Sequence, residues 1–219
     1  MTAVIDSLAF DEPNRSVFAT RIDQIKVVLD LAEREARAGS YVVVMISYEA
    51  APAFDSALSV DDSNGFPLAY AAVYSEPSNA AETCSNVSAS PWIPAVTKHE
   101  YNQSVARIHE LIATGHTYQV NYSFPLTSTF SGDSLAWYEQ LCQAQRARYS
   151  AYLDLGRYKV LSLSPELFFE RRGDHVVTVG FNVQQFGAVI VGCDGFHHPG
   201  ADFLRAAMCA AFVSDDGIV

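Results

Sequence analysis

A run of short strand-like segments separated by tight turns constrains the fold of this chain more than any other feature. The segments are apolar and rich in β-branched and aromatic residues, and Gly173-Asp174 has the composition of a hairpin turn. Along the whole chain, strands and helices come in unequal groups, which favours an α+β fold with antiparallel sheets over a doubly wound parallel fold. The predicted strands in this region are Ser150–Leu155, Tyr158–Leu163, Leu167–Arg171 and His175–Thr178.

Three helices are predicted from apolar spacing and from end signals. Arg21–Arg37 places its apolar residues on one stripe of a helix. Thr97 and Glu100 form a capping box at the start of an amphipathic helix over His99–Thr114. The third predicted helix covers Ser134–Ala144.

Further strands are expected on both sides of the second helix. Tyr41–Ile46 and Leu68–Tyr74 are short, continuous apolar runs, typical of buried strands. Thr117–Thr129 alternates loosely and predicts a long strand, with three aromatic residues on one face. We expect that face to pack in the core rather than to stack on nucleic-acid bases. The three residues are Tyr118, Tyr122 and Phe124.

The composition excludes several classes of partner. The formal net charge is -11, and such a field repels nucleic acid and anionic lipid. No apolar run approaches the roughly 18 residues of a membrane span, and Met1–Asn14 lacks the basic start of a signal peptide. We therefore expect a cytoplasmic protein with no nucleic-acid and no membrane partner.

The composition changes near residue 179. The last 40 residues hold six of the 12 glycines but only five charged residues. This step predicts two parts, residues 1–178 and an atypical tail over residues 179–219. Within the tail we expect a strand at Ala188–Val191 and a helix at Ala201–Val213.

Three segments carry motifs that are shared with one group of enzymes. Ser47–Asp55 reads S-Y-E-A-A-P-A-F-D, Gly115–Asn121 reads G-H-T-Y-Q-V-N, and Ser162–Phe169 reads S-L-S-P-E-L-F-F. Together they make Phe10–Thr178 resemble the front part of the chorismate-binding enzymes, and within them aminodeoxychorismate synthase component I. His116 departs from the family's usual Asp. The motif residues are Tyr118, Gln119, Asn121, Ser164 and Pro165.

The resemblance implies a fold, an activity and partners. The fold would be an incomplete front portion of the chorismate-binding enzyme fold, with antiparallel sheets packed face to face and helices outside. The activity would be the amination of chorismate to 4-amino-4-deoxychorismate, a transferase step toward 4-aminobenzoate and folate. Ammonia would come from a glutamine amidotransferase subunit, component II, and the family uses Mg2+.

Two positions decide whether such chemistry could run here. Glu166 matches the family's general acid, and burial among apolar neighbours such as Phe168 and Phe169 would favour its protonated form. Asn182 stands where the family has its nucleophilic Lys, and no lysine follows Glu166 in the chain. An Asn side chain cannot supply an amine nucleophile. The acidic residues that bind Mg2+ in the family are also missing, so we expect the chain alone to be inactive.

Several alternatives stay open. Tyr149 and Ser150 lie where related enzymes contribute to a tryptophan-binding pocket, although Arg148 replaces the family's Pro. Within the family, an anthranilate synthase component I is the alternative. A truncated or frameshifted enzyme fragment, a non-catalytic docking protein and a plain globular protein with a native tail are the three classes to separate.

Overall fold

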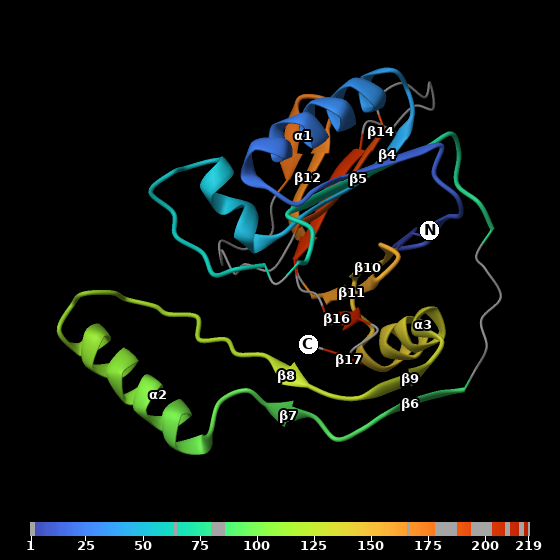
Figure 1. The fold of residues 1–219 in the computed structure, drawn as a ribbon. Helices are drawn as coiled ribbons and strands as arrows, with labels where there is room; N and C mark the ends of the chain where they lie inside the picture. The colour runs from blue at the N-terminus through green and yellow to red at the C-terminus, as the bar shows by residue number, and fades with distance from the viewer. Residues whose placement is uncertain are drawn as a thin grey trace.

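The computed structural model describes residues 3–63, 65–79, 86–165 and 167–177, and the backbone of four later strands. Two antiparallel sheets lie face to face, with helix α1 outside one sheet and helix α3 outside the other (Figure 1). The described part of the chain therefore has the α+β class that the sequence predicts. The three α-helices of this part are α1 (Ile22–Arg37), α2 (Lys98–Ala113) and α3 (Ser134–Gln145).

The larger sheet has seven strands in the order β13-β12-β15-β14-β4-β5-β3. Beside its central strand, β14, lies the pair β4 and β5, whose residues are almost all buried, as expected for apolar runs covered on both faces. Its strands are β3 (Arg15–Ala19), β4 (Tyr41–Ile46), β5 (Ala69–Tyr74), β12 (Leu167–Arg172), β13 (His175–Val177), β14 (Ala188–Cys193) and β15 (Phe203–Met208).

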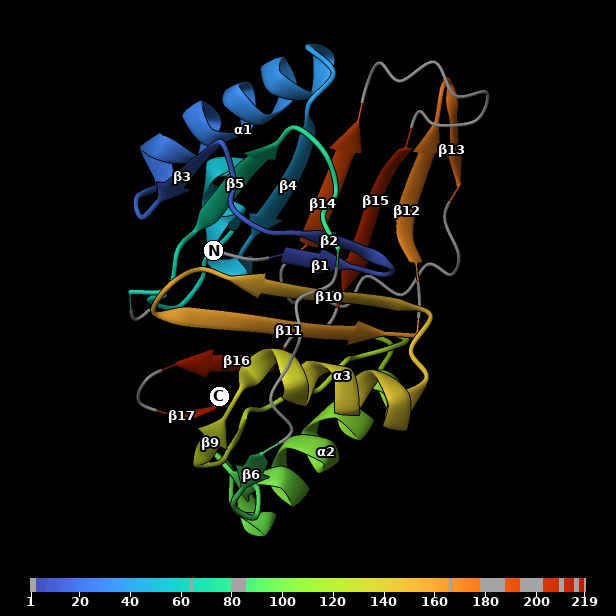
Figure 2. The same ribbon diagram turned by 90° about the vertical axis from the view of Figure 1, so that its right-hand side faces the viewer.

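The smaller sheet has six strands in the order β17-β16-β11-β10-β1-β2. Figure 2 shows that β10 and β11 run across the direction of β12, β14 and β4, so the two sheets cross at a large angle. Its strands are β1 (Ala3–Ile5), β2 (Leu8–Phe10), β10 (Tyr149–Asp154), β11 (Tyr158–Ser164), β16 (Ala211–Ser214) and β17 (Gly217–Ile218).

One apolar cluster fills the space between the sheets. Phe10 and Leu153 from the smaller sheet meet Val43, Met45 and Tyr70 from the larger sheet, and all five are buried. Burying one side chain of this size contributes about 1.5–3 kcal/mol to folding. The cluster therefore fixes how the two sheets lie on each other.

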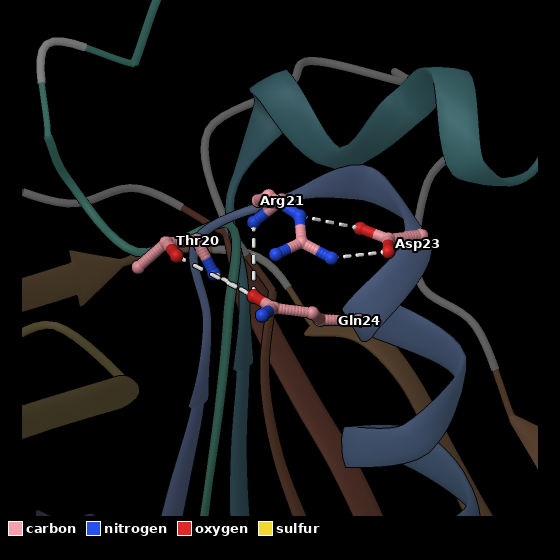
Figure 3. Close-up of polar contacts among 4 residues, drawn as sticks. All are labelled: Thr20, Arg21, Asp23 and Gln24. Atoms are coloured by element: carbon pink, nitrogen blue, oxygen red, sulfur yellow. Dashed lines mark hydrogen bonds and ion pairs between the residues drawn. The ribbon is translucent and has the colours of Figure 1, made fainter.

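Helix α1 covers the outer face of the larger sheet with Ile25, Val28 and Ala32, which recur at helical spacing. Figure 3 shows how its first turn is closed: Gln24 Oε1 accepts hydrogen bonds from the backbone N–H groups of Thr20 at 3.0 Å and Arg21 at 3.2 Å. The Arg21 guanidinium pairs with the carboxylate of Asp23 and lowers the pKa of that exposed group. These contacts satisfy donors that a helix start leaves unpaired.

Helix α3 covers the outer face of the smaller sheet. Asp133 caps it by accepting hydrogen bonds from the backbone N–H groups of Leu135 and Ala136. Trp137 and Tyr138 of α3 pack on Leu161 of β11, so the helix shields the outer face of that sheet from solvent.

Residues 86–132 form an arm that leaves the two-sheet body beside α3 (Figure 1). At its base, Gly132 has φ 123°, and a Cβ there would lie 2.2 Å from the carbonyl oxygen of Asn86, so only glycine fits. We call α2 and residues 114–125 the outer arm. No side chain of α2 is buried. The short strands of the arm are β6 (Val87–Ala89), β7 (Ile93–Pro94), β8 (Leu126–Thr127) and β9 (Phe130–Gly132).

The expected long strand over Thr117–Thr129 is wrong. The only named strand within this range is Leu126–Thr127, whose partner strand β7 is just two residues long. Tyr122 and Phe124 contact Tyr101 of α2 instead of entering the core, with ring centroids 5.8 and 5.9 Å from its ring. The expected core packing of this aromatic face is therefore also wrong.

The expected helix over Ala201–Val213 is wrong as well, whereas the expected strand at Ala188–Val191 is found within β14. β15 lies between β12 and β14 and pairs antiparallel with both. The strands on both sides of β15 form hydrogen bonds with its backbone N–H and C=O groups. This pairing with distant parts of the chain outweighs the local preference for a helix.

The cap of α2 gives a first testable prediction. Thr97 Oγ1 accepts from the Glu100 N–H at 3.2 Å, and Glu100 Oε2 accepts from the Thr97 N–H at 2.7 Å. Thr97→Ala should cost the helix about 1 kcal/mol, so amide hydrogen exchange across α2 should become about fivefold faster. Gln103→Ala, in an exposed position of the same helix, should leave the rates unchanged. Equal exchange in Thr97→Ala and the parent protein would contradict the role of the cap.

Two serines of β11 give a second prediction. Ser162 and Ser164 are each 1% exposed, but the Ser162 hydroxyl has no hydrogen-bond partner among the described residues, whereas Ser164 has a partner. Ser162→Ala should therefore raise the free energy of unfolding by about 1 kcal/mol, and Ser164→Ala should lower it by a similar amount. Urea denaturation of both variants measures this, and shifts in the same direction would refute it.

Candidate functional site

The β10–β11 hairpin positions four of the predicted site residues, Tyr149, Ser150, Ser164 and Pro165. Its turn contains Gly156 at φ 83°, and Asp154 Oδ1 accepts hydrogen bonds from the Gly156 N–H and from Lys159 Nζ, both at 2.7 Å. This turn fixes the register of the two strands. In that register Tyr149 lies directly opposite Ser164.

The pairing brings two separately predicted motifs together. Tyr149 is buried, and residues directly opposite in an antiparallel pair share one face of the sheet. Ser164 is on that face, which is the face turned toward the larger sheet, because Ala151 and Val160 on the same face belong to the inter-sheet cluster. Pro165 follows and is exposed. Tyr149 and Ser164, which come from two separately predicted motifs, are thus cross-strand neighbours.

Two predicted site positions cannot be placed. Glu166, the expected general acid, and Asn182, at the position of the family's Lys, both lie outside the described residues. Next to Glu166 the rings of Phe168 and Phe169 contact each other, with centroids 5.3 Å apart. Phe168 is 40% exposed.

Ser150 lies on the opposite face of β10 and is held by a residue that sequence reasoning missed. Asp6 Oδ1 accepts a hydrogen bond from the Ser150 N–H at 3.0 Å, and the Asp6 N–H donates to the Ser150 carbonyl at 2.8 Å. Asp6 has φ 52°, a conformation that Asp tolerates better than most residues. No local signal could identify it, because its partner is 144 positions away.

Tyr138 of α3 lies beside Ser150 in the layer between the helix and the smaller sheet. Burial raises the pKa of its hydroxyl above the ordinary value. Arg148 directly precedes β10. Its guanidinium lies 5.5 Å from the centre of the Tyr149 ring, which is a cation–π contact.

The Tyr118-Gln119-Asn121 motif lies elsewhere, in the outer arm. Thr117 Oγ1 donates to the Gln119 carbonyl at 3.0 Å and closes a local turn there. Tyr118 is 90% exposed. The structure therefore leaves this motif on the arm, away from the sheet that carries Ser164 (Figure 1).

The S-Y-E-A-A-P-A-F-D segment begins directly after β4. It forms the 3-10 helix η1 over Tyr48–Ala53, in which Ala50 is buried. Phe54 behind it is exposed. The segment therefore ends a strand of the larger sheet and presents an aromatic ring to solvent.

The described residues offer no site for the Mg2+ that the resemblance implies. Within them, no three His, Cys, Asp or Glu side chains converge as a metal site needs. The donor set therefore does not fit the ion in this part of the chain. None of the described helices has the length and apolarity that crossing a bilayer requires.

Comparison with known families identifies one matching segment. Residues 75–179 match the family described as chorismate binding enzyme. This segment contains the outer arm, α3, β10, β11 and β12, and hence the motif residues from Tyr118 to Pro165.

Curated relatives match a similar share of the chain. Aminodeoxychorismate synthase component 1 of Klebsiella aerogenes is 38% identical over 86 residues, which are 39% of this chain and 19% of that protein. The Escherichia coli protein of the same name is 39% identical over 79 residues, 36% of this chain and 17% of that protein. Anthranilate synthase component 1 of Thermus thermophilus is 33% identical over 82 residues, 37% of this chain and 18% of that protein. The matches thus span about a fifth of these relatives.

A solved structure extends the likeness of the fold beyond this segment. Anthranilate synthase component I from Streptococcus pneumoniae TIGR4 matches with a TM-score of 0.62 and 15% identity, over 81% of this chain and 53% of that one. The chain therefore has part of that fold, with its antiparallel sheets and outer helices. Residues 75–179 thus resemble chorismate binding enzymes, and parts of the chain are similar both to aminodeoxychorismate synthases and to an anthranilate synthase.

Proposed function

We propose that the chain is a fragment of an aminodeoxychorismate synthase component I, the enzyme that aminates chorismate to 4-amino-4-deoxychorismate. The observation that carries this proposal is that four of the five relatives compared have that name; three of them are 35–39% identical and the fourth is 30% identical, against 33% for the anthranilate synthase. The S-Y-E-A-A-P-A-F-D segment after β4 supports the same branch. Anthranilate synthase component I is the second candidate, favoured by the structural match.

The proposal assigns Glu166 as the proton donor at the leaving hydroxyl of the chorismate ring. Ser164 and Pro165 lead the chain to that position from the end of β11. Tyr149 lies opposite Ser164 in the hairpin. In this proposal the tryptophan-binding pocket at Tyr149 would therefore adjoin the strand end that leads to the catalytic carboxyl group.

The same proposal makes the chain inactive on its own. Asn182 stands at the position of the nucleophilic Lys, and no lysine follows Glu166. A chorismate dianion would also meet a protein of net charge -11 without a metal to offset the repulsion. The family match ends at residue 179, which supports a different origin for residues 179–219, by truncation or by a frameshift.

Two partners follow from the proposal. Chorismate is the substrate, and a glutamine amidotransferase subunit, component II, is the source of ammonia. A non-catalytic docking protein, the alternative, would still bind the glutamine amidotransferase subunit but would not use chorismate. Co-purification with a glutamine amidotransferase and chorismate turnover therefore separate the two.

An activity measurement tests the proposed inactivity. The purified chain, supplied with chorismate, Mg2+ and ammonia, should form no product, because no lysine follows Glu166 to act as the nucleophile and the described residues offer no metal site. Mass spectrometry detects the product, and Escherichia coli aminodeoxychorismate synthase component 1 under the same conditions is the positive control. Formation of 4-amino-4-deoxychorismate would disprove inactivity, and formation of anthranilate would favour the second candidate.

The coding DNA tests the origin of the tail. We expect that translation beyond the Thr178 codon in one of the other two reading frames gives P-M-K-G-T, the family's lysine motif. The codons for Phe10–Thr178, read in the same two frames, serve as the control and should contain no such motif. If neither shifted frame contains it, the frameshift hypothesis is wrong.

A further inference from the structure

Ser162 of β11 carries a buried hydroxyl group that the folded chain leaves unsatisfied. The residue is 1% exposed, and its Oγ has no hydrogen-bond partner among the described residues. An unpaired buried hydroxyl lowers the stability of a protein, so such a group in a native structure calls for an explanation. Groups that cost stability are typically kept where function needs them.

The side chain of Ser162 faces the layer between the two sheets. Ser162 lies directly opposite Ala151 in the pairing of β11 with β10, and Ala151 belongs to the apolar cluster that fills this layer. Residues directly opposite in an antiparallel pair share a face. Tyr149 is on the same face and is the diagonal neighbour of Ser162 across the two strands. The unpaired hydroxyl and the buried ring therefore adjoin the same part of the layer.

Ser150 does not share this face. Side chains alternate along a strand, so Ser150 lies on the other side of β10 from Tyr149 and Ala151. There its side chain interacts with the Tyr138 hydroxyl of α3. A ligand that lies against Tyr149 between the sheets therefore meets the side chain of Ser162 and not that of Ser150.

We propose that Ser162 Oγ forms a hydrogen bond to a ligand that binds between the sheets beside Tyr149, and that Ser162 thereby helps to select this ligand. The ligand class is an aromatic amino acid, which offers a ring to the apolar layer and polar groups to the hydroxyl. The inference rests on the tryptophan-binding pocket of the proposed function, in which Ser162 replaces Ser150 as the polar contact. It does not require the chain to use chorismate.

Two measurements on one variant test the role of the hydroxyl. Isothermal titration calorimetry of the full chain with L-tryptophan gives the affinity, and urea denaturation gives the stability. Ser162→Ala should weaken binding about tenfold, because the ligand loses a hydrogen bond. The same substitution should raise the urea midpoint, because it removes the unpaired hydroxyl. A hydroxyl with no contact to the ligand would change the midpoint and leave the affinity as it is.

A matched variant controls for the loss of any serine hydroxyl. Ser131 lies in an exposed position of β9, away from the layer between the sheets. Ser131→Ala should leave both the affinity for L-tryptophan and the urea midpoint unchanged.

Three results would overturn the proposal. If Ser162→Ala binds L-tryptophan as tightly as the parent chain, the hydroxyl does not contact the ligand. If Ser150→Ala loses affinity and Ser162→Ala does not, the polar contact is Ser150. In both cases the pocket of the proposed function stands and only the role of Ser162 is wrong. If the parent chain binds no L-tryptophan, the pocket and the role of Ser162 are wrong together.

Discussion

The apolar contact between the two sheets is the interaction on which the rest of the structure depends. Phe10 of β2 packs against Tyr74 of β5, with ring centroids 4.8 Å apart, and both belong to the cluster that fills the space between the sheets. This cluster fixes the larger sheet, which carries η1 and β12, relative to the smaller sheet, which carries Tyr149 and Ser164. Helices α1 and α3 then cover the outer faces. The outer arm does not pack against these layers, and no residue of its helix α2 is buried.

Elements whose signals are local could be predicted from the sequence. The apolar stripe of α1 and the Thr97–Glu100 box of α2 lie within the helices they define, and both helices are found within one residue of the expected start. The strands β4 and β5 are continuous apolar runs and are found as well, as are the shorter-patterned strands β10 and β11. In contrast, β1 and β2 have three residues each, which is too short for a period to be recognised.

Elements that depend on a distant partner could not be predicted. The residues after α2 alternate like a strand, but a strand forms only where another strand accepts its backbone hydrogen bonds. Here Leu126–Thr127 meets Ile93–Pro94 and the segment before it has no such neighbour in the described structure. The candidate site divides in the same way: Tyr149 and Ser164 are adjacent in space, as one hairpin dictates, whereas the Tyr118 motif is not beside them. For Glu166 and Asn182, outside the described residues, the expectations remain predictions.

The place of β1 in the smaller sheet has a consequence for synthesis of the protein. β1 pairs with β10, and Asp6 binds Ser150 across 144 positions of sequence. At typical translation speeds of about 5–20 residues per second, roughly 7–30 seconds pass between the two strands leaving the ribosome. During this interval β1, which contains Ile5, lacks the strand β10 with which it pairs in the folded chain. The nascent chain therefore exposes an apolar N-terminal hairpin that a holding chaperone could recognise before the sheet closes.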